Sequence, residues 1–193
     1  MSQNNIRTLL QGNPIVPVVK IEHLKEVIPL LDYLKENNFN SIEITLRTDC
    51  AMDAIRLAKE HCDDSFLVGA GSVINKEQIA NLLEIGVDFV VLPGIQKDLI
   101  EVLEELKIPF LPGVMTPSEI MEALLLGWDT LKFFPAHIAG GIEALKTYSQ
   151  VFPRVKFCPT GGIGVENHND FLALDNVLSV GGSWVQKKFN NKL

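Results

Sequence analysis

The stretch Ser41-Ile42-Glu43-Ile44-Thr45-Leu46 is short, rich in β-branched and apolar residues, and typical of a buried strand. Seven similar runs recur along the chain with helix-like segments between them. Several of the runs show little polar alternation, as in strands that are covered on both faces of a parallel sheet. The eight predicted strands are residues 15–20, 41–46, 66–72, 89–94, 109–114, 130–135, 156–161 and 177–183.

The segments between these runs carry helix signals. Residues 23–36 place apolar side chains on one face and charges on the other. Helix starts are predicted at Asn75, at Asp49 and at Thr116, where Thr116-Pro117-Ser118-Glu119 has the form of a capping box. Helix ends are predicted at Gly86 and Gly127.

Eight alternating strands and helices predict an α/β protein with one domain over residues 1–193, a compact (β/α)8 TIM barrel. The alternative is an open doubly wound sheet. Its dinucleotide fingerprint fails, because Ile74 stands where the third glycine after Gly69-Ala70-Gly71 belongs. Residues 184–193 are short for a closing helix, so we expect a truncated C-terminal end, and residues 4–11 are predicted to form a short N-terminal helix over the barrel floor.

Composition excludes several classes of partner. Lys and Arg total 17 against 24 Asp and Glu, a net charge of −7, whereas nucleic acids and anionic membranes need a basic face. The uncharged stretches are too short to cross a bilayer, and residues 1–10 lack a signal-peptide core. Three cysteines without a C-x-x-C pair indicate reduced thiols. These features predict a cytoplasmic protein and do not rule out a small anionic substrate.

Two charged residues lie inside predicted strands, Glu43 and Lys132. Such side chains are almost never fully buried unless they are paired. One interpretation is a static salt bridge between the two. The other is a Schiff-base nucleophile, since desolvation by Leu131, Phe133 and Phe134 favours the neutral amine of Lys132 over the ammonium.

Glu43, Thr45 and Arg47 share strand parity and should face the same side. Glu43 could act there as a general base, and Arg47 could hold a carboxylate with two hydrogen bonds. The alternative is an ion pair between Glu43 and Arg47 within one strand.

Two glycine-rich turns follow the last two predicted strands, Thr160-Gly161-Gly162-Ile163-Gly164 and Gly181-Gly182-Ser183. TIM barrels often bind phosphate with these two loops, where backbone N–H groups approach the oxygens. The glycines could instead serve only as tight turns. The four histidines show no metal-ligand spacing, so no metal site is predicted.

These residues together resemble the class I 2-keto-3-deoxy-6-phosphogluconate (KDPG) aldolases, which include the 4-hydroxy-2-oxoglutarate (KHG) aldolases. The resemblance covers about residues 15–184. It rests on five motifs: Ile42-Glu43-Ile44-Thr45-Leu46-Arg47-Thr48, Gly69-Ala70-Gly71-Ser72-Val73, Lys132-Phe133-Phe134-Pro135-Ala136, Cys158-Pro159-Thr160-Gly161-Gly162-Ile163 and Gly181-Gly182-Ser183-Trp184.

The resemblance implies a trimeric (β/α)8 barrel that cleaves KDPG to pyruvate and glyceraldehyde 3-phosphate, and also KHG to pyruvate and glyoxylate. It implies Lys132 as the Schiff-base lysine, with no other cofactor, and Glu43 as the proton shuttle. The remaining residues that it implies bind the substrate: Arg47 and Ser72 at the carboxylate, Pro93, Phe134 and Thr160 around the substrate, and Gly161, Gly162, Gly182 and Ser183 at the phosphate.

The chain departs from the family pattern in two places. Position 72 is more often Thr, and Ser72 keeps the hydroxyl without the methyl group. Relatives continue beyond Gly-Gly-Ser-Trp into a further helix. Two rival functions stay open: cleavage of the unphosphorylated substrate alone, and binding of a phosphorylated metabolite without catalysis.

Overall fold

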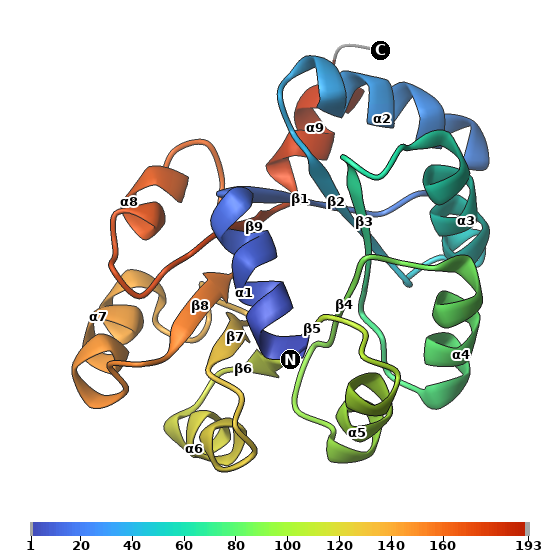
Figure 1. Ribbon diagram of the computed structural model, residues 1–193. Coiled ribbons are helices and arrows are strands. Elements are labelled where there is room, and N and C mark those ends of the chain that lie inside the picture. Colours follow the sequence, from blue (N-terminus) through green and yellow to red (C-terminus); the bar gives the residue numbers. More distant parts are fainter. Residues whose placement is uncertain (1, 192–193) are drawn as a thin grey trace.

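In the computed structural model, which describes residues 2–191, parallel strands alternate with helices along the chain (Figure 1). The strands are β1 (Ile15–Val19), β2 (Ser41–Thr45), β3 (Leu67–Gly71), β4 (Phe89–Val91), β5 (Phe110–Leu111), β6 (Gly113–Val114), β7 (Thr130–Phe133), β8 (Lys156–Pro159) and β9 (Val180–Gly182). Each of the eight predicted runs therefore contains a strand.

Helices precede, separate and follow these strands along the chain. They are α1 (Ser2–Gly12), the 3-10 turn η1 (Leu24–Glu26), α2 (Val27–Glu36), α3 (Ala51–His61), α4 (Lys76–Ile85), α5 (Lys97–Glu105), α6 (Pro117–Leu125), α7 (Gly141–Val151), α8 (His168–Leu172) and α9 (Trp184–Asn190). The helix predicted over residues 23–36 is thus divided into η1 and α2.

The strands form two parallel sheets. Six strands make a curled sheet in the order β5-β4-β3-β2-β1-β9, and three make a second sheet in the order β6-β7-β8. Helices α2 to α7 lie outside the strands (Figure 1). Their apolar faces pack with the outward-facing strand residues in one large core that contains Leu31, Ile55 and Phe133. Helices on the outside of a parallel sheet cover the face that would otherwise be exposed.

The fifth predicted strand is broken at Pro112. On one side of the proline, β5 pairs with β4, and on the other side β6 pairs with β7. Proline has no backbone N–H to donate to a ladder, although its carbonyl still accepts from Lys132 N at 2.8 Å. The break therefore marks the place where the chain passes from one sheet to the other.

The two sheets also approach each other beside β8. Isolated parallel bridges join Phe157 to Val177 and Thr160 to Gly181, and Leu178 N donates to Phe157 O at 3.0 Å. The chain before and within β9 thus lies alongside β8.

Helix α1 covers the end of the interior where the strands begin. Its Ile6 and Leu10, both fully buried, form a second apolar cluster with the inward-facing Val16, Phe89, Val91, Leu111 and Cys158. Arg7 fixes the helix through Asp129 and the hydroxyl of Thr130. The predicted N-terminal helix over the floor is therefore confirmed.

Three of the predicted helix boundaries are confirmed in detail. Asn75 accepts a hydrogen bond from Gln78 N, and Gly86 adopts the left-handed conformation that ends α4. Thr116 and Glu119 form the predicted capping box with Pro117 at the first helical position. Partial burial opposes the charge on Glu119, but the amides of the same turn and the Thr116 hydroxyl hold its pKa below the ordinary value.

The predicted start at Asp49 is wrong, because α3 begins one residue later with Cys50 at the cap position. The Cys50 thiol instead lies within hydrogen-bond distance of the carbonyls of Ile21 and Glu22.

At the C-terminal end, the segment predicted to be short forms the seven-residue helix α9, which buries Val185 and Phe189. Within residues 2–191, no helix is both long and apolar enough to span a bilayer.

Candidate active site

A pocket of about 150 Å³ opens where the strands end. Cavities of about this size bind molecules such as benzene, so the pocket has room for a small molecule. The parallel strands bring their carboxyl ends together here, which is where TIM-barrel enzymes place their catalytic groups. The residues that line the pocket are Val18, Glu43, Thr45, Arg47, Ser72, Pro93, Lys132, Phe134, Thr160, Gly161, Gly162, Ile163, Gly181 and Ser183.

The pocket contains a buried ion pair. Lys132 Nζ lies 3.2 Å from Glu43 Oε1, and the two residues are 6% and 3% exposed. They come from β7 and β2, so the pair joins the two sheets across the interior. The predicted partnership of Lys132 and Glu43 is confirmed, and the amine also faces a cavity that could admit a substrate.

The apolar surroundings of Lys132 differ from the expectation. Leu131 and Phe133 alternate to the other face of β7 and pack in the outer core, with Phe133 against the rings of Tyr148 and Phe157. Phe134, after the end of the strand, does line the pocket, and Lys132 Nζ lies 5.1 Å from its ring centroid. Only one of the three predicted apolar neighbours therefore faces the amine.

Glu43 fits in its strand because of Gly71 on the adjacent strand β3. A Cβ atom at Gly71 would overlap the carboxyl group of Glu43. The absence of a side chain at this position leaves the space that the carboxylate occupies beside Lys132. Gly71 is thus part of the site, although it carries no functional group.

Arg47 lies at the mouth of the pocket, beyond the end of β2. Its Nε donates to Thr45 Oγ1 at 3.0 Å, and among residues 2–191 no carboxylate pairs with it. The alternative of an ion pair between Glu43 and Arg47 is therefore wrong, because Glu43 turns to Lys132. All three residues of matching parity, Glu43, Thr45 and Arg47, nevertheless line the pocket as predicted.

Ser72 and Pro93 follow β3 and β4 and form another wall. Ser72 has a positive φ of 60°, a left-handed conformation that costs more for a β-branched side chain. Serine has no branch at Cβ, so it meets less of this cost than a threonine would.

The glycine-rich turns form the far side of the pocket. Gly161 and Gly162 have φ values of 98° and 72°, and a Cβ atom at Gly162 would overlap His137. Ser183, at the start of α9, faces the same space. The structure therefore brings the two turns together, as predicted from their places after the last strands.

The comparisons with known proteins agree with this geometry. The family model described as KDPG and KHG aldolase matches residues 6–192. The chain belongs to this family. The KHG/KDPG aldolase of Escherichia coli K12 is 39% identical over 183 residues, which cover 95% of this chain and 85% of the relative. The 2-dehydro-3-deoxy-phosphogluconate aldolase of Dickeya dadantii is 41% identical over 177 residues, 92% and 83% of the two chains.

A solved relative extends the likeness to structure. The KDPG aldolase of Legionella pneumophila, with pyruvate captured at low pH as a covalent carbinolamine intermediate, superposes with a TM-score of 0.91. It is 40% identical, and the match covers 96% of this chain and 91% of that one.

Ten of the eleven site residues expected for a KDPG and KHG aldolase line the pocket of this chain. The exception is Gly182, which is buried beside Trp184, where a Cβ atom would overlap the indole ring. Its neighbour Gly181 lines the pocket instead, and a Cβ atom there would overlap the side chain of Thr160.

Two pocket residues were not expected from the sequence, Val18 on β1 and Ile163 after β8. The place of Val18 follows from the parallel register of β1 and β2, in which it lies opposite Glu43. Two other polar residues near strand ends serve elsewhere: Lys20 pairs with Glu22, and Thr116 caps α6. Among residues 2–191, no group of three His, Cys, Asp or Glu side chains is placed to hold a metal ion.

Proposed function

We propose that the protein is a class I aldolase that cleaves 2-keto-3-deoxy-6-phosphogluconate to pyruvate and glyceraldehyde 3-phosphate. It also cleaves 4-hydroxy-2-oxoglutarate to pyruvate and glyoxylate. The observation that carries this proposal is the buried contact of 3.2 Å between Lys132 and Glu43 at the wall of a small pocket. An ion pair that served stability alone would gain little over apolar residues of the same volume.

The reaction begins when the neutral amine of Lys132 adds to the C2 ketone. Glu43 moves the protons that convert the carbinolamine to an iminium ion with loss of one water molecule. Its carboxylate is placed for this role because it lies within hydrogen-bond distance of the reacting nitrogen.

Bond cleavage uses the same two groups. As Glu43, through a water molecule, takes the proton of the C4 hydroxyl, the C3–C4 electron pair moves toward the iminium nitrogen and the aldehyde leaves. The remaining enamine of pyruvate is protonated at C3, and hydrolysis of the iminium releases pyruvate and Lys132. The protonated imine is the electron acceptor, so the covalent bond to Lys132 does the work of a cofactor.

The other pocket residues hold the substrate in this proposal. Arg47 and Ser72 bind the carboxylate, and Pro93, Phe134 and Thr160 enclose the carbon chain. Gly161, Gly162 and Ser183 bind the phosphate. Gly182 contributes through the backbone conformation of the second turn. Support comes from the geometry: the cation of Arg47 has no carboxylate partner in residues 2–191, and the two glycine-rich turns face the same space.

Measuring pyruvate release from both substrates tests the proposal. Because the glycine-rich turns have no partner in the unphosphorylated substrate, kcat/KM is expected to be higher for 2-keto-3-deoxy-6-phosphogluconate than for 4-hydroxy-2-oxoglutarate. Equal values would remove the phosphate role of the turns. No pyruvate from either substrate would contradict the aldolase assignment and favour a binding protein.

The architecture is part of the proposal. We place the strands in one closed, compact (β/α)8 TIM barrel that forms a single domain over residues 1–193. Two features support closure: β5 and β6 continue each other across Pro112, and an isolated bridge joins Thr160 to Gly181.

The assembly is a homotrimer in the cytoplasm. Exposed apolar side chains of Met121, Leu125 and Ile138, on α6 and after β7, support a subunit interface. Light scattering tests this: the wild-type chain should have the mass of a trimer and Leu125→Lys a smaller mass. The three cysteines are all free, which fits a reducing compartment.

A further inference from the structure

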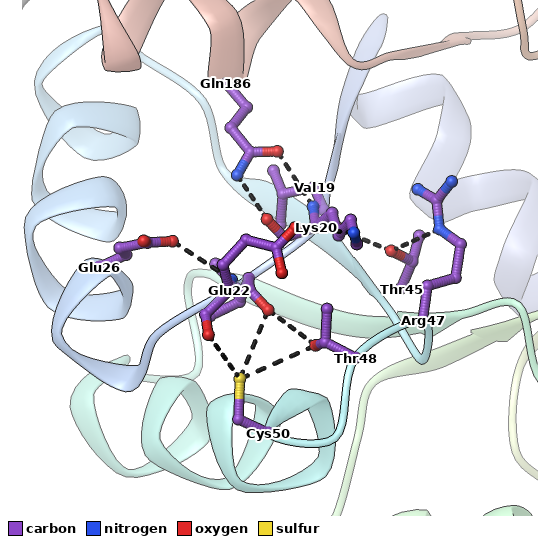
Figure 2. A network of polar contacts seen from close by, with 10 residues as sticks. Val19, Lys20, Glu22, Glu26, Thr45, Arg47, Thr48, Cys50 and Gln186 are labelled. Carbon is purple, nitrogen blue, oxygen red and sulfur yellow. Dashed lines mark hydrogen bonds and ion pairs between the residues drawn. The ribbon is translucent and has the colours of Figure 1, made fainter.

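One peptide unit beside the pocket is held at both of its ends by side chains. The carbonyl of Val19 accepts from Thr45 Oγ1 at 2.8 Å, and the N–H of Lys20, in the same peptide group, donates to Gln186 Oε1 at 3.0 Å. Gln186 also donates from Nε2 to Lys20 O at 2.7 Å. Figure 2 shows that these contacts connect β1, β2 and α9.

The direction of the Thr45 hydroxyl is fixed by its partners. A carbonyl oxygen can only accept, so the single hydroxyl hydrogen of Thr45 must point to Val19 O. The lone pairs of the same oxygen then face Arg47, whose Nε donates to it at 3.0 Å (Figure 2). Thr45 is 2% exposed, so water does not compete for these contacts.

The end of β2 brings Arg47 back over Thr45. Arg47 N donates to Thr45 O at 2.8 Å, which closes a three-residue turn around Leu46. With Nε engaged by Thr45, the two terminal nitrogens of the guanidinium stay available at the pocket mouth. This orientation suits a carboxylate that accepts two parallel hydrogen bonds.

The contacts therefore form a chain in which every donor points the same way. It runs from Arg47 Nε to the Thr45 hydroxyl, then through the Val19–Lys20 peptide to Gln186. Hydrogen bonds in such a chain polarise and strengthen one another. Helix α9 is thereby linked to the cation that the proposed function assigns to the substrate carboxylate.

We propose that Thr45 and Gln186 are positioning residues that orient Arg47 toward the carboxylate of the 2-keto acid. Neither takes part in proton transfer or in bond formation at C2. The inference rests on the proposed function, because it assumes that Arg47 binds this carboxylate. It adds that helix α9 tunes substrate affinity through a backbone peptide, at a distance from the reacting carbon.

Borohydride trapping at increasing pyruvate concentrations tests the proposal. Thr45→Val keeps the branched shape but removes the hydroxyl, and we expect it to need about tenfold more pyruvate for half-maximal trapping. Gln186→Leu, farther along the chain of contacts, should need about threefold more. In the cleavage assay KM should rise while kcat changes little, since the carboxylate is bound throughout the reaction.

Matched controls separate positioning from general damage. Thr48→Val removes the hydroxyl of the residue after Arg47, which donates to Ile21 O at 2.7 Å and has no hydrogen bond to Arg47 in the described structure, so this variant should titrate like the wild type. Thr45→Ser should restore the affinity. Methyl pyruvate, a neutral ester, should show the same half-maximal concentration in the wild type and in Thr45→Val.

The outcomes distinguish this inference from the proposed function. If Thr45→Val titrates like the wild type, or weakens pyruvate and methyl pyruvate equally, the positioning role is wrong while the aldolase assignment stands. The positioning role is also wrong if Thr45→Ser fails to restore affinity. If the wild-type chain cannot be trapped at any pyruvate concentration, the proposed function fails, and the inference fails with it.

Discussion

The two ends of the strands present opposite environments to the interior. At the carboxyl end, Glu43 and Lys132 face a pocket that is open to small molecules. At the other end, Ile6 and Leu10 of α1 seal an apolar cluster that surrounds Cys158. Burial raises the pKa of this thiol to about 12, despite the opposing charge of Lys132.

The contrast separates stability from chemistry. The floor holds closely packed apolar side chains, so substitutions there should lower the free energy of unfolding and have little effect on kcat/KM. The pocket holds polar groups whose burial costs free energy, so substitutions there should mainly lower kcat or kcat/KM. Four predictions test this division, in order of expected effect.

The largest effect is expected for Lys132→Met. Removal of the nucleophile should lower kcat by roughly 10⁴-fold or more in the pyruvate-release assay, while circular dichroism stays native. Loss of one partner leaves Glu43 buried without a counter-charge, at a cost of about 3–5 kcal/mol of unfolding free energy. The double variant Lys132→Met/Glu43→Gln should recover part of that stability and none of the activity. A grossly unfolded double variant would contradict the division.

At the floor, Leu10→Ala should behave in the opposite way. Leu10 is 1% exposed, and its truncation leaves a cavity that should lower the free energy of unfolding by about 2–5 kcal/mol in urea titrations. The kcat/KM of the folded fraction should stay within about twofold of the wild type, since no pocket residue moves. A tenfold loss of kcat/KM would show that the floor supports the chemistry directly.

Gly71→Ala tests the space beside Glu43. The new methyl group would overlap the carboxylate, so Glu43 must shift and kcat should fall by about 10²-fold. Gly12→Ala is the matched control at the floor, where a Cβ atom meets nothing within 4 Å. It should leave kcat unchanged. Equal kinetics in the two variants would refute the role assigned to Gly71.

The smallest effect concerns Cys158 and pH. Because its pKa is raised from about 9 to about 12 by burial, the folded state binds more protons than the unfolded state between these values. Its contribution to stability is therefore complete below pH 9 and is lost as pH rises toward 12, by up to about 1.4 kcal/mol per pH unit. Urea titrations from pH 8 to 10.5 should show a steeper fall for the wild type than for Cys158→Ala. Parallel curves would contradict the raised pKa.

Much of the site could be predicted from local sequence. Glu43 and Lys132 stood out because charges interrupt apolar strands, and strand parity placed Thr45 and Arg47 on the same side. The glycine-rich turns could be placed because both follow predicted strands. Local patterns of this kind predict the site because alternate residues of a strand point to opposite faces, one toward the helices and the other toward the interior between the strands.

Other features depend on contacts between distant segments and leave little trace in local sequence. The space that Gly71 leaves for Glu43 requires knowledge of the register between β2 and β3. Helix α3 has Cys50 and not Asp49 at its cap position, and the Cys50 thiol contacts the carbonyl of Ile21, 29 residues away, which local sequence does not show. The side-chain contacts of Thr45 likewise involve Val19, which is 26 residues away.

The central claim is that the amine of Lys132 forms a covalent bond with a 2-keto acid. Incubation with pyruvate and borohydride, followed by peptide mapping by mass spectrometry, tests it most directly. We predict one reduced pyruvate adduct per chain, located on Lys132, and none in Lys132→Met. An adduct on another lysine, or no adduct under conditions that label a known Schiff-base aldolase, would contradict the claim.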